Sequence, residues 1–174
     1  KPLGIDVVDH KDKDKRINFR KINALNLSLK RGIKFDLILI KQTIHLMKFS
    51  EIKKLLKLLK KKLNPNGQIL IFFLDMEKNE IPTFKLMKLK LNQSLLRDRK
   101  ILNIIKKMFP KTIKKKFVFN VKISKKKYLE MIENRYISTL IPLSKKQLNE
   151  GIKEIKLKYK DILRFKDKLI CINL

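Results

Sequence analysis

The chain is poor in several residue types, and each shortage excludes a class of protein. A single cysteine, Cys171, excludes a disulfide framework and a cysteine-rich zinc site. The two histidines, His10 and His45, stand far apart in the sequence, so we expect no metal site. The longest wholly apolar run, ILIFFL at residues 69–74, is far too short to span a bilayer. No secretory signal is present, and we expect a cytoplasmic protein without a membrane segment.

Acidic residues are scarce as well. The 16 Asp and Glu stand against 45 Lys and Arg, which gives a formal net charge of +29. Such an excess is typical of nucleic-acid binding, because these cations neutralise phosphates. Yet lysine supplies 38 of the 45 and arginine only 7, although arginine is preferred for bidentate contacts to phosphates and bases. Alanine occurs once and glycine four times, a profile typical of A/T-rich coding. We therefore interpret most of the lysine as drift on solvated faces, with a functional basic surface that binds nucleic acid non-specifically as the alternative.

Aliphatic residues, in contrast, are abundant, and 174 residues with 44% hydrophobic side chains favour one folded domain. The apolar runs at 35–40 and 69–74 predict strands buried on both faces of a parallel sheet. Between them, residues 50–63 repeat Ile and Leu at the helical period and predict a helix. The sequence NPNG at 64–67 predicts the turn that follows. Together these segments predict one right-handed βαβ unit.

Other segments continue the alternation of strands and helices. Further strands are predicted at residues 2–8, at the start of 17–27, at 117–123 and at 168–173. Further helices are predicted within 80–109, from Ser124 to Glu133, and from Ser144, which has capping-box spacing to Gln147. The pattern predicts an α/β layered domain.

Five segments, spread over nearly the whole chain, carry motifs: GID at 4–6, NA at 23–24 with Leu27, FDLILI with QTIH at 35–45, LNPNGQILI at 63–71, and NRYISTL with PLS at 134–144. In this order and spacing they resemble the class I S-adenosylmethionine-dependent methyltransferases of the type 11 kind. The first four resemble the ends of that family's second, third and fourth strands and the turn into its fifth. The last is similar to the tail of a bacterial branch.

The resemblance implies a Rossmann-like methyltransferase sheet, mostly parallel with an antiparallel last strand. It implies one domain over residues 1–174, with the core sheet in 1–75 and 115–174 and a helical substrate-cap segment at roughly 77–110. The family also has a first strand and a glycine-rich loop, because only glycine lets the backbone approach the cofactor closely. The four glycines of this chain are scattered, and it begins with Lys1. We therefore expect the first strand and the glycine loop to be missing, as in a fragment, a processed product or a trimmed chain.

The resemblance also implies a cofactor, S-adenosyl-L-methionine, and residues that would bind it. Asp6, at a strand end, is placed to accept the ribose hydroxyls. Asn23, beside Ala24, stands where the family often has an Asp that faces the adenine amino group, and its amide oxygen remains an acceptor. Lys41 follows the fourth strand, on the side of the sheet where ligands bind. The alternative for Asn23 is an ordinary turn residue.

A methyl acceptor would be held by residues that follow the fourth strand and by the tail. His45 is the candidate catalytic base, because it titrates near neutrality. Gln42, Arg135 and Tyr136 are candidate substrate-binding residues, since an Arg beside an aromatic ring can hold a carboxylate. The alternative for His45 is a histidine packed at the start of a helix, and the alternative for Arg135 and Tyr136 is structural packing against the sheet.

The implied activity is methyl transfer to a small-molecule acceptor, weak or absent in this fragment. The alternatives are an RNA methyltransferase with a basic surface and a degenerate, non-catalytic basic binding protein. Cys171 is interpreted as a buried strand thiol.

Overall fold

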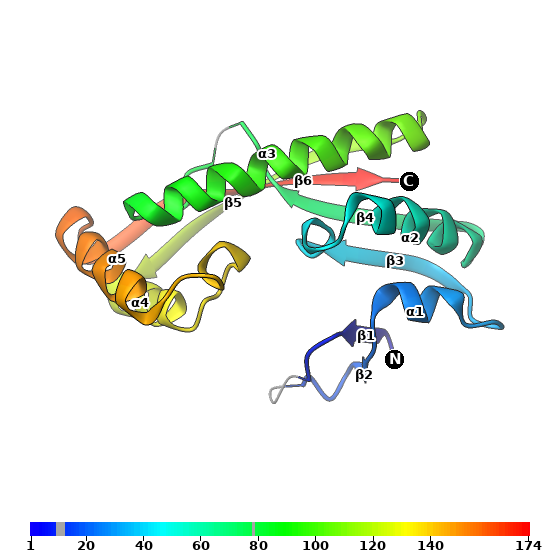
Figure 1. The fold of residues 1–174 in the computed structure, drawn as a ribbon, viewed down its shortest axis with the longest axis horizontal. Coiled ribbons are helices and arrows are strands. Elements are labelled where there is room, and N and C mark those ends of the chain that lie inside the picture. Colours follow the sequence, from blue (N-terminus) through cyan, green and yellow to red (C-terminus); the bar gives the residue numbers. More distant parts are fainter. Residues whose placement is uncertain (10–12, 78) are drawn as a thin grey trace.

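The computed structural model describes residues 1–9, 13–77 and 79–174, and His10 lies outside them (Figure 1). The strands are β1 (Leu3–Asp6), β2 (Asn18–Lys21), β3 (Phe35–Lys41), β4 (Leu63–Leu74), β5 (Ile113–Ser124) and β6 (Ile162–Asn173). The helices are α1 (Ala24–Leu29), α2 (Phe49–Lys61), α3 (Lys85–Met108), α4 (Lys125–Glu133) and α5 (Lys145–Lys158). Two short 3-10 helices are η1 (Ile44–Leu46) and η2 (Ser138–Leu140).

The described strands form two sheets. A four-stranded sheet has the order β3-β4-β6-β5, in which β3 and β4 are parallel and β6 is antiparallel to both of its neighbours. The strands β1 and β2 form a separate parallel pair. In Figure 1, β1, β3 and β4 run in the same direction, so their carboxyl ends lie on the same side. The prediction of a mostly parallel α/β fold with an antiparallel last strand is confirmed.

One face of the four-stranded sheet packs against α2 and α3. Every second residue of β4, namely Ile69, Ile71 and Phe73, is at most 1% exposed. These side chains share one core with the leucines of α2 and with the apolar side of α3. The helix predicted at 50–63 is confirmed as α2, which ends at Lys61 because β4 begins at Leu63. Burial of this apolar face is what holds the helix on the sheet.

The predicted turn at 64–67 lies inside β4. The β3–β4 register shifts between Phe35, opposite Leu63, and Leu37, opposite Gln68, so the four turn residues form a bulge. Asn66 has a left-handed φ of 64°, and a Cβ on Gly67 would lie 2.9 Å from the carbonyl oxygen of Phe35. The expectation that the strand starts only at residue 69 is therefore wrong, although the turn signal itself was correct.

The strands β5 and β6 are longer than predicted. They pair along their whole length, from Ile113 opposite Asn173 to Ser124 opposite Ile162. The residues added to β5, 113–116, include three lysines, and those added to β6, 162–167, carry no long apolar run, so only the backbone ladder reveals them. The helices α4 and α5 pack on the far end of this ribbon and form a second core.

The last helix begins as predicted. The Ser144 hydroxyl accepts from the Gln147 N–H at 3.2 Å, and the Gln147 side chain accepts from the Ser144 N–H at 2.9 Å. The capping box is therefore confirmed.

The segment at 77–110 contains α3. Most buried residues of α3, among them Leu95, Ile101 and Ile105, belong to the core shared with α2 and β4. The helix thus covers the sheet, and only Leu91, Ser94 and Asp98 also line a cavity. Among the helices of the described residues, none has the length and apolarity that a bilayer crossing requires.

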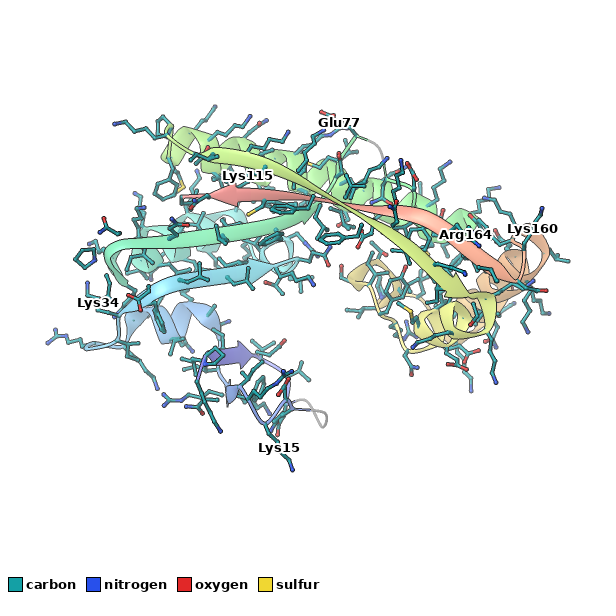
Figure 2. All side chains as sticks on the ribbon, turned by 180° about the vertical axis from the view of Figure 1, so that it is seen from behind. Lys15, Lys34, Glu77, Lys115, Lys160 and Arg164 are labelled. Atoms are coloured by element: carbon teal, nitrogen blue, oxygen red, sulfur yellow. The ribbon has the colours of Figure 1, made fainter. Side chains whose placement is uncertain are left out.

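The opposite face of the sheet is bare around β3 and the first half of β5, as far as the described residues go. Figure 2 shows these strands from behind, with α2 and α3 on the far side. Leu37 and Leu39 are 56% and 58% exposed, and Phe119 is 52% exposed. The prediction that residues 35–40 are buried on both faces is therefore wrong, because no helix of the described chain covers their second face.

The four lysines labelled in Figure 2 lie far apart, on or beside different elements. Lys15 follows β1, Lys34 precedes β3, Lys115 is on β5 and Lys160 follows α5. This spread agrees with the interpretation that much of the lysine lies on solvated faces.

Candidate functional site

Two adjoining cavities lie where β3 and β4 end. The first, of about 180 Å³, is called the polar cavity; its walls include His45, Ser94, Asp98, Ser138 and Thr139. The second, of about 250 Å³, is called the aromatic cavity; its walls include Tyr128, Phe165 and Asp167. Both are also lined by Gln42, Leu74, Tyr136 and Ile137, so the two adjoin and are together called the joined cavities. In open α/β sheets this end of the strands is where ligands bind.

The backbone around His45 is fixed from two sides. Directly after β3, Gln42 has a left-handed φ of 52°, and its N–H donates to the carbonyl of Phe72 at 3.0 Å. On the other side, Arg97 of α3 donates to the carbonyls of His45 at 2.7 Å and Met47 at 2.5 Å. These bonds hold η1, and with it the imidazole, against the cavity.

The His45 ring lies between a hydroxyl and a carboxyl group. Its Nε2 is 3.0 Å from Ser138 Oγ, and its Nδ1 is 3.8 Å from Asp98 Oδ1. Burial, together with the positive charge of Arg97, lowers the pKa of His45, so the ring is neutral at neutral pH. A neutral imidazole can accept a proton from a ligand. Ser, His and Asp are also the residues of a nucleophilic triad, but 3.8 Å is too long for the His–Asp hydrogen bond that such a triad requires.

Two polar side chains in the polar cavity are buried without a hydrogen-bond partner. Asp98 is 3% exposed, and its Oδ1 has no hydrogen-bond partner among the described residues. Thr139 is 7% exposed, and the same holds for its Oγ1. Burial raises the pKa of Asp98 to about 7, against the opposing effect of Arg97. Buried polar atoms are nearly always hydrogen-bonded, so these two indicate a place for a polar ligand group.

The aromatic cavity is bounded by three rings. The ring centroids of Tyr128 and Tyr136 are 5.8 Å apart, and those of Tyr128 and Phe165 are 6.3 Å apart. The Tyr136 hydroxyl lies 2.9 Å from the Tyr128 hydroxyl, which itself donates to the carbonyl of Pro82. Burial raises the pKa of Tyr136 to about 12, so its hydroxyl stays protonated at neutral pH.

The aromatic cavity also contains a carboxyl group. The Oδ1 atom of Asp167 is buried and has no hydrogen-bond partner among the described residues. Burial raises the pKa of Asp167, and the positive charge of Lys41 opposes that rise. Each of the joined cavities therefore presents one carboxyl group.

Four of the predicted site residues are brought together at these cavities: Lys41, Gln42, His45 and Tyr136. Arg135 is adjacent in sequence, but its guanidinium donates to the carbonyls of Leu140 and Ile141 and holds the η2 turn. It is not among the described residues that line either cavity. This contact is the packing alternative considered for Arg135.

Sequence reasoning missed four cavity residues: Asp98, Ser138, Thr139 and Asp167. A signal existed only for Asp98, which follows Leu95 by three residues and precedes Leu102 by four. It thus occupies a position on the apolar stripe of α3, where an acid is out of place. Ser138 and Thr139 lie within the tail motif at 134–144, which indicated no role for them, and Asp167 lies in no motif.

The remaining predicted cofactor residues lie at the carboxyl end of β1 and β2. Asp6 is paired with Lys21, and the Ile22 N–H donates to the carbonyl of Asp6 at 2.8 Å, so Asn23 lies close by. The Asp6 carboxylate accepts from the Val8 N–H at 3.0 Å, and Asn23 Oδ1 accepts from the Leu25 N–H at 2.8 Å. Asn23 is therefore the N-cap of α1.

Ala24 is the first residue of α1 and packs against the core that α2 and α3 share.

Cys171 is buried, and burial raises its pKa, which confirms the prediction of a buried thiol. In the described parts of the chain, no group of three or more His, Cys, Asp or Glu side chains is arranged to hold a metal ion.

No protein-family model and no curated protein matches the chain. Solved structures do. One, from Anabaena variabilis, is named as a candidate methyltransferase from an antibiotic biosynthesis pathway; it is 11% identical, has a TM-score of 0.57, and the match covers 99% of this chain and 81% of that one. Another, from Anaeromyxobacter dehalogenans, is named as a candidate type II methyltransferase, with 9% identity, a TM-score of 0.52, and 98% and 78% of the two chains covered. The chain has the fold of the class I methyltransferases.

A third similar structure is the plantazolicin methyltransferase BpumL, in complex with a substrate analog and SAH. It is 14% identical with a TM-score of 0.47, and the match covers 99% of this chain but only 65% of that protein. The chain thus accounts for less of this protein than of the two named above.

Proposed function

We propose that the chain binds S-adenosyl-L-methionine and transfers its methyl group to a small molecule, with His45 as the general base. The observation that carries the proposal is the neutral His45 in a polar cavity at the carboxyl ends of β3 and β4. The methyltransferase fold supports it, since Asp6 and Asn23 lie at the carboxyl ends of β1 and β2.

The residues at the β1–β2 end fit part of the cofactor. A carboxylate can accept several hydrogen bonds, so the bond from the Val8 N–H to Asp6 is compatible with ribose hydroxyls as further donors. The Asn23 side chain, beside Ala24, retains its amide donor for the adenine ring while its oxygen caps α1. None of the four glycines follows the carboxyl end of a strand, so we assign no residue of this chain to a glycine loop.

The roles of the cavity residues follow from their geometry. When bound, S-adenosyl-L-methionine supplies an electrophilic methyl group, whose bond to sulfur breaks as the acceptor's nucleophile bonds to the carbon. His45 Nε2 takes the proton that the nucleophile loses, at the position where Ser138 Oγ now lies 3.0 Å away. Gln42 and Tyr136 line the space for the acceptor, and Lys41 lies at the strand end toward the cofactor. Alignment of the reacting atoms supplies much of the rate.

The first test is binding. Calorimetry with S-adenosylhomocysteine on the chain should show one site, and Asp6→Ala should weaken binding by about tenfold or more through the lost ribose contacts. Glu133→Ala, a change at an exposed residue at the end of α4, is the control and should have no effect. If the unmodified chain binds no S-adenosylhomocysteine, the proposal fails, and the degenerate binding protein is the better interpretation.

The second test is transfer of a labelled methyl group, with excess protein and long incubation. His45→Gln should slow transfer by roughly 10²-fold or more while cofactor binding stays unchanged. A mixture of small molecules and RNA should show which acceptor carries the label. Label in RNA alone would replace the small-molecule assignment with the RNA methyltransferase.

A further inference from the structure

Asp98 and Asp167 are unusual among the acids of this chain. The protein has 45 Lys and Arg against 16 Asp and Glu, and several of these acids are paired with a lysine. Asp75, Glu80 and Asp161, for example, each lie within 4 Å of a lysine Nζ. Within the described chain, Asp98 and Asp167 have no such lysine or arginine partner, and each has an Oδ1 without a hydrogen bond. Both line the joined cavities, so a ligand there can supply the missing donor to each Oδ1.

The polar cavity is rich in acceptors. Asp98, which is 3% exposed, offers Oδ1, and Thr139, which is 7% exposed, offers Oγ1. The neutral His45 adds a ring nitrogen. A ligand group with several N–H donors satisfies all of them, whereas a carboxylate satisfies only the Thr139 hydroxyl. An ammonium group has three donors and the charge that Asp98 needs.

The aromatic cavity suits the rest of such a ligand. Tyr128, Tyr136 and Phe165 present ring surfaces, and aromatic faces attract cations as well as apolar groups. Asp167 adds a second negative group on the wall. With volumes of about 180 and 250 Å³, the two cavities suit a ligand smaller than a drug-sized molecule.

We propose that the joined cavities bind a small cationic amine, with its ammonium group on Asp98 and Thr139 and its apolar body between the rings of the aromatic cavity. The assignment rests on the proposed function, since it names the acceptor of that same site. In the transfer, His45 takes one proton from the ammonium group. The nitrogen lone pair then bonds to the methyl carbon, the carbon–sulfur bond breaks with its electron pair left on sulfur, and the product is the methylated ammonium ion.

The net charge makes this proposal easy to separate from non-specific attraction. A protein with a net charge of +29 attracts anions and repels cations over its surface at low salt. A preference for a cation therefore has to come from local groups, and a preference for an anion is what the overall field alone produces.

The test uses the fluorescence of the protein itself. The chain has no tryptophan and three tyrosines, of which Tyr128 and Tyr136 line the aromatic cavity. Titrations of the whole chain with benzylamine, benzyl alcohol and benzoate, at constant ionic strength, compare a cation, a neutral molecule and an anion of similar size. We expect benzylamine to quench tyrosine emission and to bind about tenfold tighter than benzyl alcohol, with benzoate weakest.

Two variants test whether benzylamine binds in the polar cavity. Asp98→Asn keeps the size of the side chain and should weaken benzylamine about tenfold while benzyl alcohol changes less than about twofold. Glu133→Gln, an exposed acid at the end of α4, is the matched control and should change neither. A thermal melt of each variant checks folding, and Asp98→Asn should not lower the midpoint, because it removes a buried charge without a cationic partner.

Several results would overturn the proposal: no probe binds, benzyl alcohol or benzoate binds as tightly as benzylamine, or Asp98→Asn leaves benzylamine affinity unchanged. S-adenosylhomocysteine binding, measured on the same sample, separates the two proposals. Amine binding without cofactor binding removes methyl transfer and keeps the amine site. Cofactor binding without amine preference removes the amine site and keeps methyl transfer.

Discussion

The two faces of the four-stranded sheet are built from the same strands and differ in what covers them. On the face under α2 and α3, Ile69, Ile71 and Phe73 are at most 1% exposed. On the other face, Leu37 and Leu39 of β3 are more than half exposed. The residue types are nearly the same on both faces, so burial is decided by the helices and not by the strands. An apolar residue of β3 is therefore buried only where a helix lies over it.

The largest expected effect is a difference in the free energy of unfolding between alanine variants of a buried and an exposed phenylalanine. Phe73→Ala, on the covered face, should lower the free energy of unfolding by about 3–5 kcal/mol, because it leaves a cavity in the core. Phe119→Ala, on β5 and 52% exposed, should cost about 1 kcal/mol or less. Urea denaturation of both variants measures the difference. Equal losses would show that Phe119 is covered in solution.

Burial on the covered side stabilises an apolar side chain but destabilises the charged form of the Asp98 carboxyl. The pKa of Asp98 is raised from 3.8 to about 7, so the folded protein holds a proton there that the unfolded chain releases. Stability from this group is present below about pH 4 and is lost as pH rises toward 7. Asp98→Asn should therefore be more stable than the unmodified protein at pH 7.5, by on the order of 3 kcal/mol, and the gap should close by pH 4.

Denaturation curves at several pH values measure this gap. Glu133→Gln, at an exposed position, should follow the unmodified protein at every pH. A gap for Asp98→Asn that stays constant from pH 4 to 7.5 would mean that burial does not shift the ionisation of this carboxyl.

The smallest effect on stability is expected on the bare face. Leu39→Thr should change the free energy of unfolding by about 0.5 kcal/mol or less, since the side chain is 58% exposed and Thr suits a strand. It should, however, reduce the binding of a hydrophobic dye, because Leu39 is exposed on the same face of β3 as the exposed Leu37. The control is Leu157→Thr on α5, where a single leucine is 90% exposed. If both changes reduce dye binding equally, the bare face is not the dye-binding patch.

Much of the fold could be predicted because it depends on local apolar patterns. The runs at 35–40 and 69–74, and the helical repeat between them, gave β3, β4 and α2. The lengths of β5 and β6 could not be predicted, since charged residues interrupt the added parts and pairing between distant segments holds them. The bare face could not be predicted either, because a run such as FDLILI looks the same with or without a helix over its second face.

The candidate site was predictable only near the strand ends. Lys41, Gln42 and His45 were identified because they follow β3, and that position is set by local sequence. Asp98, Thr139 and Asp167 come from three distant segments, and only the tertiary fold brings them to one space.

The position of β6 in the sheet has a consequence for folding during synthesis. It is the last of the described strands in sequence, yet it lies between β4 and β5 in the sheet. During synthesis, β4 and β5 therefore have no common neighbour until β6 leaves the ribosome, and their edges stay unpaired until then. Such edges favour aggregation. Completion of this sheet therefore waits for β6.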